Sequence, residues 1–183
     1  MAILAIPAIL AIMAIPRVGV SACLLGEEVR YDGGHKRSAT LVDLIGPRVE
    51  LVPVCPEVEV GMGTPREPLQ LVRDGRGVRM VTVRTGIDYT DRVNEWARAR
   101  VRELEQAGIH GYVLKSGSPS CGLEAPVLSE RSESKGTGLF ATILVTSMRD
   151  LPVIDEKGLE DASSRAEFMQ RVIARHAADS NRV

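Results

Sequence analysis

The sequence predicts an α/β fold: a single-domain, parallel-sheet (Rossmann-like) layer sandwich with an edge hairpin. Two observations support this prediction. Short apolar runs of strand length, bounded by glycine or proline, alternate along the chain with longer segments of helical periodicity. The 183 residues, 44% of them hydrophobic, suffice for one continuous core, and no repeat or linker in the sequence marks a second domain.

Four segments are expected to form the buried strands of the sheet. They share a continuous apolar character over a strand's length, which is typical of parallel strands covered on both faces. These segments are residues 17–22, 49–54, 109–114 and 151–154.

Two further segments are expected outside the buried strands. Residues 69–83 carry Asp74-Gly75 between two apolar runs, which predicts a β-hairpin at the edge of the sheet. Residues 129–136 are rich in serine, glutamate and glycine, and we expect a mobile loop there.

Four helices are expected between the strands, at residues 38–45, 88–107, 138–148 and 163–178. The second has the clearest period, because an apolar stripe runs along it and Gly108 follows as a C-cap. The stripe consists of Val93, Trp96, Ala97, Val101 and Leu104. The predicted order is therefore β-α-β-hairpin-α-β-α-β-α, and we assign residues 17–183 to one domain.

Residues 1–16, MAILAIPAILAIMAIP, are interpreted as an apolar N-terminal extension. They lack the basic start of a signal peptide, and Pro7 and Pro16 interrupt them well short of a membrane span. We therefore expect no membrane association. An apolar extension favours self-association, so a monomer or a weak homodimer is expected.

Charge and cysteine content exclude other classes. A net charge of −1 gives no basic field for nucleic acid, and the arginines between residues 66 and 84 are interrupted by Asp74, as on a solvated hairpin. No stable nucleic-acid complex is expected. Three cysteines, an odd number in a chain of this size, argue against a secreted disulfide framework and favour a cytoplasmic protein.

The cysteines are the main candidates for a functional site. Cys23, Cys55 and Cys121 each follow the carboxyl end of a predicted strand, where open α/β sheets bind ligands. We expect the three thiols to converge on one crevice. A single cysteine is more often a small buried hydrophobe, and three thiolates holding zinc are an alternative. An iron-sulfur cluster is favoured, because soft thiolates suit iron and flanking glycines and prolines leave room for a large inorganic group.

Polar residues beside the cysteines supply candidate chemistry. Glu57, in CPEVEVGMGTPREP, is placed to accept a proton from water. The segment KSGSPSCG offers Ser116 and Ser118 as further catalytic candidates, and it offers Lys115, Gly117 and Ser120 for substrate binding. The alternatives are that Glu57 caps the following turn and that the serines bond only their own backbone. The polar loop YDGGHKRS is interpreted as a segment that closes over the crevice, with His35 structural.

Three motifs together resemble a known family. VGVSACLLGEEVRYDGGHKRS, LVPVCPEVEVGMGTPREP and LKSGSPSCG, in this order, are similar to those of a bacterial and archaeal family once filed as a domain of unknown function. Its characterised members are iron-sulfur thiouracil desulfidases. The resemblance extends from residue 17 to the last helix.

The resemblance implies a cofactor and a reaction. Similar proteins bind a [4Fe-4S] cluster through three cysteines, which would be Cys23, Cys55 and Cys121 here. The iron left without a protein ligand would act as a Lewis acid on the C=S bond of a small thiolated nucleobase, 2- or 4-thiouracil. Glu57 would serve as acid and base in a non-redox reaction, and the products would be uracil and hydrogen sulfide.

Two other classes are alternatives at this point. One is an iron-sulfur or zinc module that recognises thiolated nucleobases or RNA without cleaving them. The few aromatic residues, 3% of the chain, count against a base-stacking RNA surface. The other is a redox or cluster-carrier protein.

Overall fold

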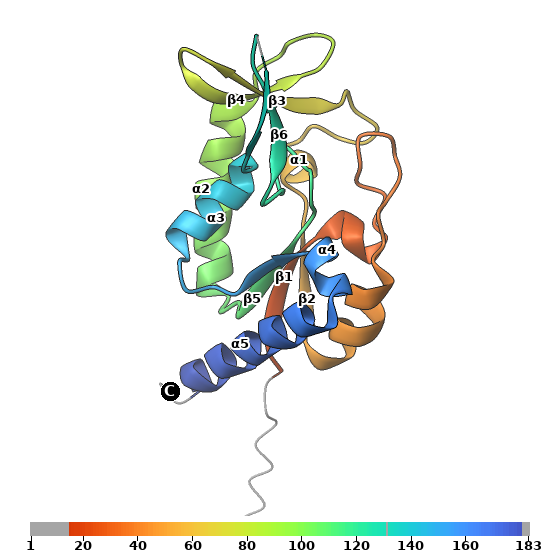
Figure 1. The fold of residues 1–183 in the computed structure, drawn as a ribbon, viewed down its shortest axis with the longest axis vertical. Coiled ribbons are helices and arrows are strands. Elements are labelled where there is room, and N and C mark those ends of the chain that lie inside the picture. The colour runs from red at the N-terminus through yellow and green to blue at the C-terminus, as the bar shows by residue number, and fades with distance from the viewer. Residues whose placement is uncertain (1–14, 131, 181–183) are drawn as a thin grey trace, which may run out of the picture.

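A computed structural model describes residues 15–130 and 132–180. It shows a parallel sheet between two layers of helices, with a second sheet beyond one end of the first (Figure 1). The predicted α/β class with a parallel sheet is confirmed. Residues 1–14, most of the predicted N-terminal extension, lie outside the described residues.

The parallel sheet has the strand order β2-β1-β5-β8. Its strands are β1 (Arg17–Ser21), β2 (Glu50–Val54), β5 (Gly111–Leu114) and β8 (Val153–Asp155), and all neighbours run parallel. All four predicted strands are therefore present, but only the central strands β1 and β5 are buried as expected. The strands β2 and β8 are partly exposed because they lie at the edges of the sheet. The chain continues from β1 to β2 on one side and later returns to β5 on the other, so the strand order switches at β1 and β5. This is where open α/β sheets form a ligand crevice beyond their carboxyl ends.

Alternate side chains of the parallel sheet pack against different helices. Tyr112 and Leu114 of β5 face one layer, whereas Val113 faces the other. Gly19 of β1 is required by this packing, because a Cβ atom there would lie 2.3 Å from the ring of Tyr112. A larger side chain at residue 19 would therefore displace the Tyr112 ring.

The helices cover both faces of this sheet. α2 (Thr90–Gln106) and α3 (Leu139–Ser147) share a core with Tyr112, and the predicted stripe of α2 is buried except for Trp96, which is partly buried. The π-helix η2 (Thr40–Ile45), α4 (Glu156–Glu160) and α5 (Ala162–Ser180) cover the opposite face. Three short elements complete the set: η1 (Ala22–Leu25), η3 (Gly46–Arg48) and α1 (Pro56–Glu59). None of the helices within residues 15–130 and 132–180 is long and apolar enough to cross a membrane.

The predicted hairpin forms, but it does not lie at the edge of the parallel sheet. β3 (Leu69–Asp74) and β4 (Gly77–Thr82) belong to a second sheet of order β4-β3-β6-β7, with β6 (Ala125–Leu128) and β7 (Glu133–Gly136). The reason is that the hairpin buries its own apolar face, including Leu71 and Met80, in a separate core with Val127 of β6.

The prediction of a mobile loop at residues 129–136 is wrong, because Glu133–Gly136 is strand β7. This strand pairs only with β6 and leaves Glu133, Ser134 and Lys135 exposed. A solvated edge strand shows no apolar alternation, so its sequence looks like that of a loop.

Candidate functional site

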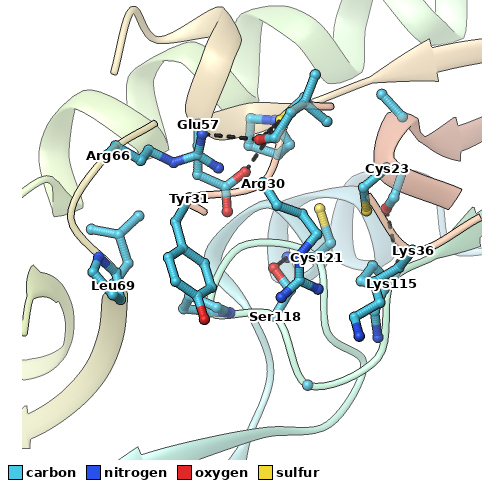
Figure 2. A pocket seen from close by; sticks show the side chains of 18 of the residues that line it. Cys23, Arg30, Tyr31, Lys36, Glu57, Arg66, Leu69, Lys115, Ser118 and Cys121 are labelled. Carbon is cyan, nitrogen blue, oxygen red and sulfur yellow. Dashed lines mark hydrogen bonds between the residues drawn. The ribbon is translucent and has the colours of Figure 1, made fainter. Parts of the chain in front are cut away.

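A cavity of about 310 Å³ lies at the carboxyl ends of β1, β2 and β5 and is closed on its far side by residues leading into β3. Its volume is near the lower end of the range for small-molecule sites. Figure 2 shows side chains from η1, α1, the start of β3 and the loops between them around this space.

The three cysteines line this one cavity. Cys23 lies in η1 directly after β1, Cys55 is the N-cap of α1 after β2, and Cys121 lies in the loop after β5. All three are free thiols. The three thiols therefore lie around one cavity, as their positions after the strand ends predicted.

Burial keeps these thiols protonated at neutral pH. Burial, together with the neighbouring Glu57 carboxylate, raises the pKa of Cys23 to about 11 and that of Cys55 to about 12. The pKa of the fully buried Cys121 is likewise well above its usual value, for the same two reasons. Thiolates therefore form here only when a strong cation replaces the three protons, as a bound metal centre does.

The donor set fits an iron-sulfur cluster better than a single ion. Among the described residues, no group of three or more His, Cys, Asp or Glu side chains is close enough to hold one metal ion. In a cluster each iron takes one thiolate, so the thiols need not converge on one atom. Soft sulfur donors without a nearby histidine also match iron-sulfur chemistry.

Glu57 lies in the first turn of α1 and faces the cavity with 9% of its surface exposed. Pro56 at the first helical position presets the backbone of this turn. The Glu57 Oε1 atom accepts a hydrogen bond of 2.9 Å from the hydroxyl of Ser120, and Oε2 lies 3.6 Å from the Cys55 sulfur. One carboxylate oxygen is thus fixed while the other stays beside the thiols.

Glu59 secures the same turn from the opposite side. It accepts the backbone N–H of Cys55 at 3.1 Å and forms an ion pair with Arg100 of α2 at 3.1 Å. It does not line the cavity. Its contacts fix the backbone that carries both Cys55 and Glu57.

Ser118 and Ser120 have different positions. The Ser118 Oγ atom lines the cavity and accepts the backbone N–H groups of Ser120 at 3.2 Å and Cys121 at 3.0 Å. Ser120, expected to bind substrate, is fully buried behind the cavity and donates to Glu57 instead. Ser120 is therefore not placed to contact a substrate and instead holds the side chain of Glu57.

Lys115 and Ser116 are held by a residue that the sequence analysis missed, Glu156. Its carboxylate accepts the Lys115 ammonium at 2.5 Å and both the N–H and the hydroxyl of Ser116 at 2.7 Å. These bonds lower the pKa of Glu156 although burial raises it, so the carboxylate is charged. Lys115 also donates to the Ser116 carbonyl and hydroxyl, at 2.7 and 3.2 Å, so all three ammonium protons are used within this group.

Gly117, which was expected to bind substrate, also differs from the prediction. Gly117 has a left-handed φ of 68° and lines the cavity, but its N–H donates to the Glu124 carbonyl at 3.1 Å. This bond fixes the turn before Ser118. The turn amide is therefore not available to a ligand.

Four further residues line the cavity: Arg30 and Arg66, which were not predicted at the site, and Tyr31 and Lys36, which belong to the loop expected to cover the crevice. The segment 26–37, which includes most of the loop expected to cover the crevice, forms part of this wall. Arg66 holds it in place through its backbone N–H to the Tyr31 carbonyl at 2.8 Å and its side chain to the Val29 carbonyl at 2.9 Å. The positive charge of Arg30 lowers the pKa of Cys23, and that of Arg66 lowers the pKa of Cys55, both against the larger effect of burial.

Comparison with known proteins gives three matches. A family model described as 2-thiouracil desulfurase matches residues 18–156. The uncharacterized protein YbbK of Bacillus subtilis (strain 168) is 31% identical over 147 residues, which cover 78% of this chain and 97% of YbbK. A solved structure, the [4Fe-4S]-dependent thiouracil desulfidase TudS, is 31% identical with a TM-score of 0.65, and the match covers 83% of this chain and 98% of that chain.

Proposed function

The chain belongs to the 2-thiouracil desulfurase family, and from this premise we propose that it is an iron-sulfur dependent thiouracil desulfidase. It would take a small thiolated nucleobase, 2- or 4-thiouracil, and convert it with water to uracil and hydrogen sulfide. The main support is that three free cysteines from three strand ends share one cavity with Glu57.

Cys23, Cys55 and Cys121 would hold a [4Fe-4S] cluster, which is the cofactor printed for the similar TudS. Three thiolates for four irons leave one iron without a protein ligand. When bound, such a cluster supplies a Lewis acid for the sulfur of the substrate.

Glu57 is the proposed acid and base. The overall reaction replaces C=S by C=O, and the two hydrogens of water leave with the sulfur, so no electrons are exchanged. A base must take a proton from water at the carbon under attack and return it later. Ser120 holds Oε1, and Oε2 no longer contacts a thiol proton once Cys55 is a thiolate. Oε2 is therefore the atom that would hold the proton.

Ser118 is the proposed proton relay, in preference to Ser116. Its oxygen accepts two backbone N–H groups, and no acceptor for its own hydroxyl proton lies among residues 15–130 and 132–180. That proton is available to a substrate in the cavity. The Ser116 hydroxyl, in contrast, already donates to Glu156.

Lys115 and Glu156 are proposed as positioning residues. Because the ammonium protons are used by Glu156 and Ser116, Lys115 would contribute its charge and hold the turn rather than bind the substrate directly. Cys121 and Ser118 lie on the same loop, so this anchor would determine where both are presented.

The test is an anaerobic assay of the reconstituted protein. Iron and sulfide are measured per chain, and 2-thiouracil is then followed for equal release of uracil and sulfide. Glu57→Gln should keep the iron but lose most of the turnover. A fully loaded protein that binds thiouracil without releasing sulfide would overturn the enzyme assignment and support a binding module, whereas zinc in place of iron would overturn the cluster.

A further inference from the structure

Tyr31 is the single aromatic side chain among the described residues that line the cavity. It is 41% exposed, although two of the three tyrosines are at least partly buried elsewhere, in the cores beside the two sheets. We propose that Tyr31 is the surface on which the pyrimidine ring of the substrate stacks. This inference rests on the proposed function and adds the residue that selects a planar ring.

The position of Tyr31 is fixed before any ligand binds. Its carbonyl accepts a hydrogen bond from the Arg66 N–H at 2.8 Å. Two further backbone bonds close the turn around it: the Gly33 N–H donates to the Arg30 carbonyl at 3.0 Å, and the Arg30 N–H donates to the Gly34 carbonyl at 3.2 Å. Because the backbone on both sides of Tyr31 is already held, binding need not order this segment, which favours affinity.

The surroundings of the ring favour flat contact. The Arg30 guanidinium lies over one face of the ring, 5.5 Å from the centroid, and Tyr31 itself lines the cavity and is 41% exposed, which leaves its other face for a ligand (Figure 2). The nearby apolar wall is aliphatic and comes from Val29, Pro68 and Leu69. Tyr31 therefore supplies the π-face of the site.

This placement predicts selectivity for planar heterocycles. A thiouracil ring has two π-faces, and base stacking on an aromatic side chain contributes roughly 5- to 150-fold in affinity by substitution. An open-chain thioamide such as thioacetamide has the same C=S group but no ring. It should gain much less from Tyr31.

The experiment compares the loaded wild type with Tyr31→Phe, Tyr31→Leu and the matched control Tyr89→Leu, which removes a half-buried tyrosine outside the cavity. Uracil binding is measured by equilibrium dialysis, and KM and kcat are measured for 2-thiouracil. Tyr31→Leu should raise the uracil Kd and the KM at least about 5-fold with a smaller change in kcat. Tyr31→Phe and Tyr89→Leu should resemble the wild type in Kd and KM. All four proteins should contain the same amount of iron per chain.

Two results would overturn the inference. One is an unchanged uracil Kd in Tyr31→Leu, and the other is an equal loss in Tyr31→Phe, which would assign the effect to the hydroxyl group. If the wild type releases no sulfide from thiouracil, the proposed function fails. The uracil dialysis is independent of turnover and still decides whether Tyr31 binds the ring.

Discussion

The buried hydroxyl of Ser120 donates a 2.9 Å hydrogen bond to Glu57 Oε1, across 63 residues of sequence. This bond joins the loop that carries Cys121 to the first turn of α1, which carries Cys55 as its N-cap. Two of the three cysteine segments and the proposed acid and base therefore form one unit.

Ser120→Ala should lower both activity and stability. The substitution leaves a buried carboxylate oxygen without its donor, which costs ~1–3 kcal/mol in the free energy of unfolding. Because Glu57 loses its fixed orientation, kcat should fall while iron content is retained. Chemical denaturation and steady-state kinetics on the loaded protein check this, and wild-type kcat in Ser120→Ala would refute the positioning role.

Ser116 and Ser118, two of the three serines that line the cavity, should respond differently to substitution. Ser118→Ala removes the hydroxyl whose proton is unused, so kcat should fall about 10²-fold or more, as for loss of a proton-transfer group. Ser116→Ala removes a bond to Glu156 and should have a smaller effect. The ratio of the two kcat values is the measurement, and a larger loss for Ser116→Ala would reverse the assignment.

Glu156→Gln should reduce activity about 10- to 100-fold, the usual effect of removing an outer partner of a metal site. It weakens the contacts that hold Lys115 and Ser116. Glu124→Gln is the matched control, since it breaks a surface Lys-Glu pair with Lys135 of similar length, 2.6 Å. Sulfide release per iron is compared in the two variants, and equal activities would show that the Glu156 contacts are not needed.

The raised pKa of Cys23 predicts slow alkylation of the metal-free protein. A thiol with a pKa of about 11 has roughly a hundredth of the thiolate of an ordinary cysteine at pH 8, because the folded state favours the protonated form. Its reaction with iodoacetamide should be about 100-fold slower than that of the unfolded chain and should rise about tenfold per pH unit from pH 8 to 10. Mass spectrometry of the Cys23 peptide measures this rate, and a plateau near pH 9 would contradict the raised pKa.

The sequence predicted those parts of the molecule that depend on apolar runs. The apolar runs at residues 17–22, 49–54, 109–114 and 151–154 all form strands, although only the two central strands β1 and β5 are buried, and the carboxyl ends of β1, β2 and β5 locate the cysteines. Strand β7 was missed because it is a solvated edge.

The site residues that were not predicted correctly were missed for other reasons. Glu156 follows the carboxyl end of β8, as Cys23 follows that of β1, so its position was a usable signal. Tyr31 begins the loop YDGGHKRS that was expected to close over the crevice, but its exact place in the cavity wall depends on hydrogen bonds from Arg66, far along the chain, which the sequence does not show. The same limit applies to Ser120, whose burial behind Glu57 is a property of the folded loop.

The most direct test of the central claim is Mössbauer spectroscopy of the protein reconstituted with ⁵⁷Fe, recorded with and without 2-thiouracil under anaerobic conditions. If Cys23, Cys55 and Cys121 hold a [4Fe-4S] cluster and leave one iron for the substrate, the spectrum should show three irons that are unaffected and one that shifts when thiouracil is added. Four irons that all remain unchanged in the presence of a substrate that binds, or a cluster retained in full after Cys121→Ser, would contradict the account.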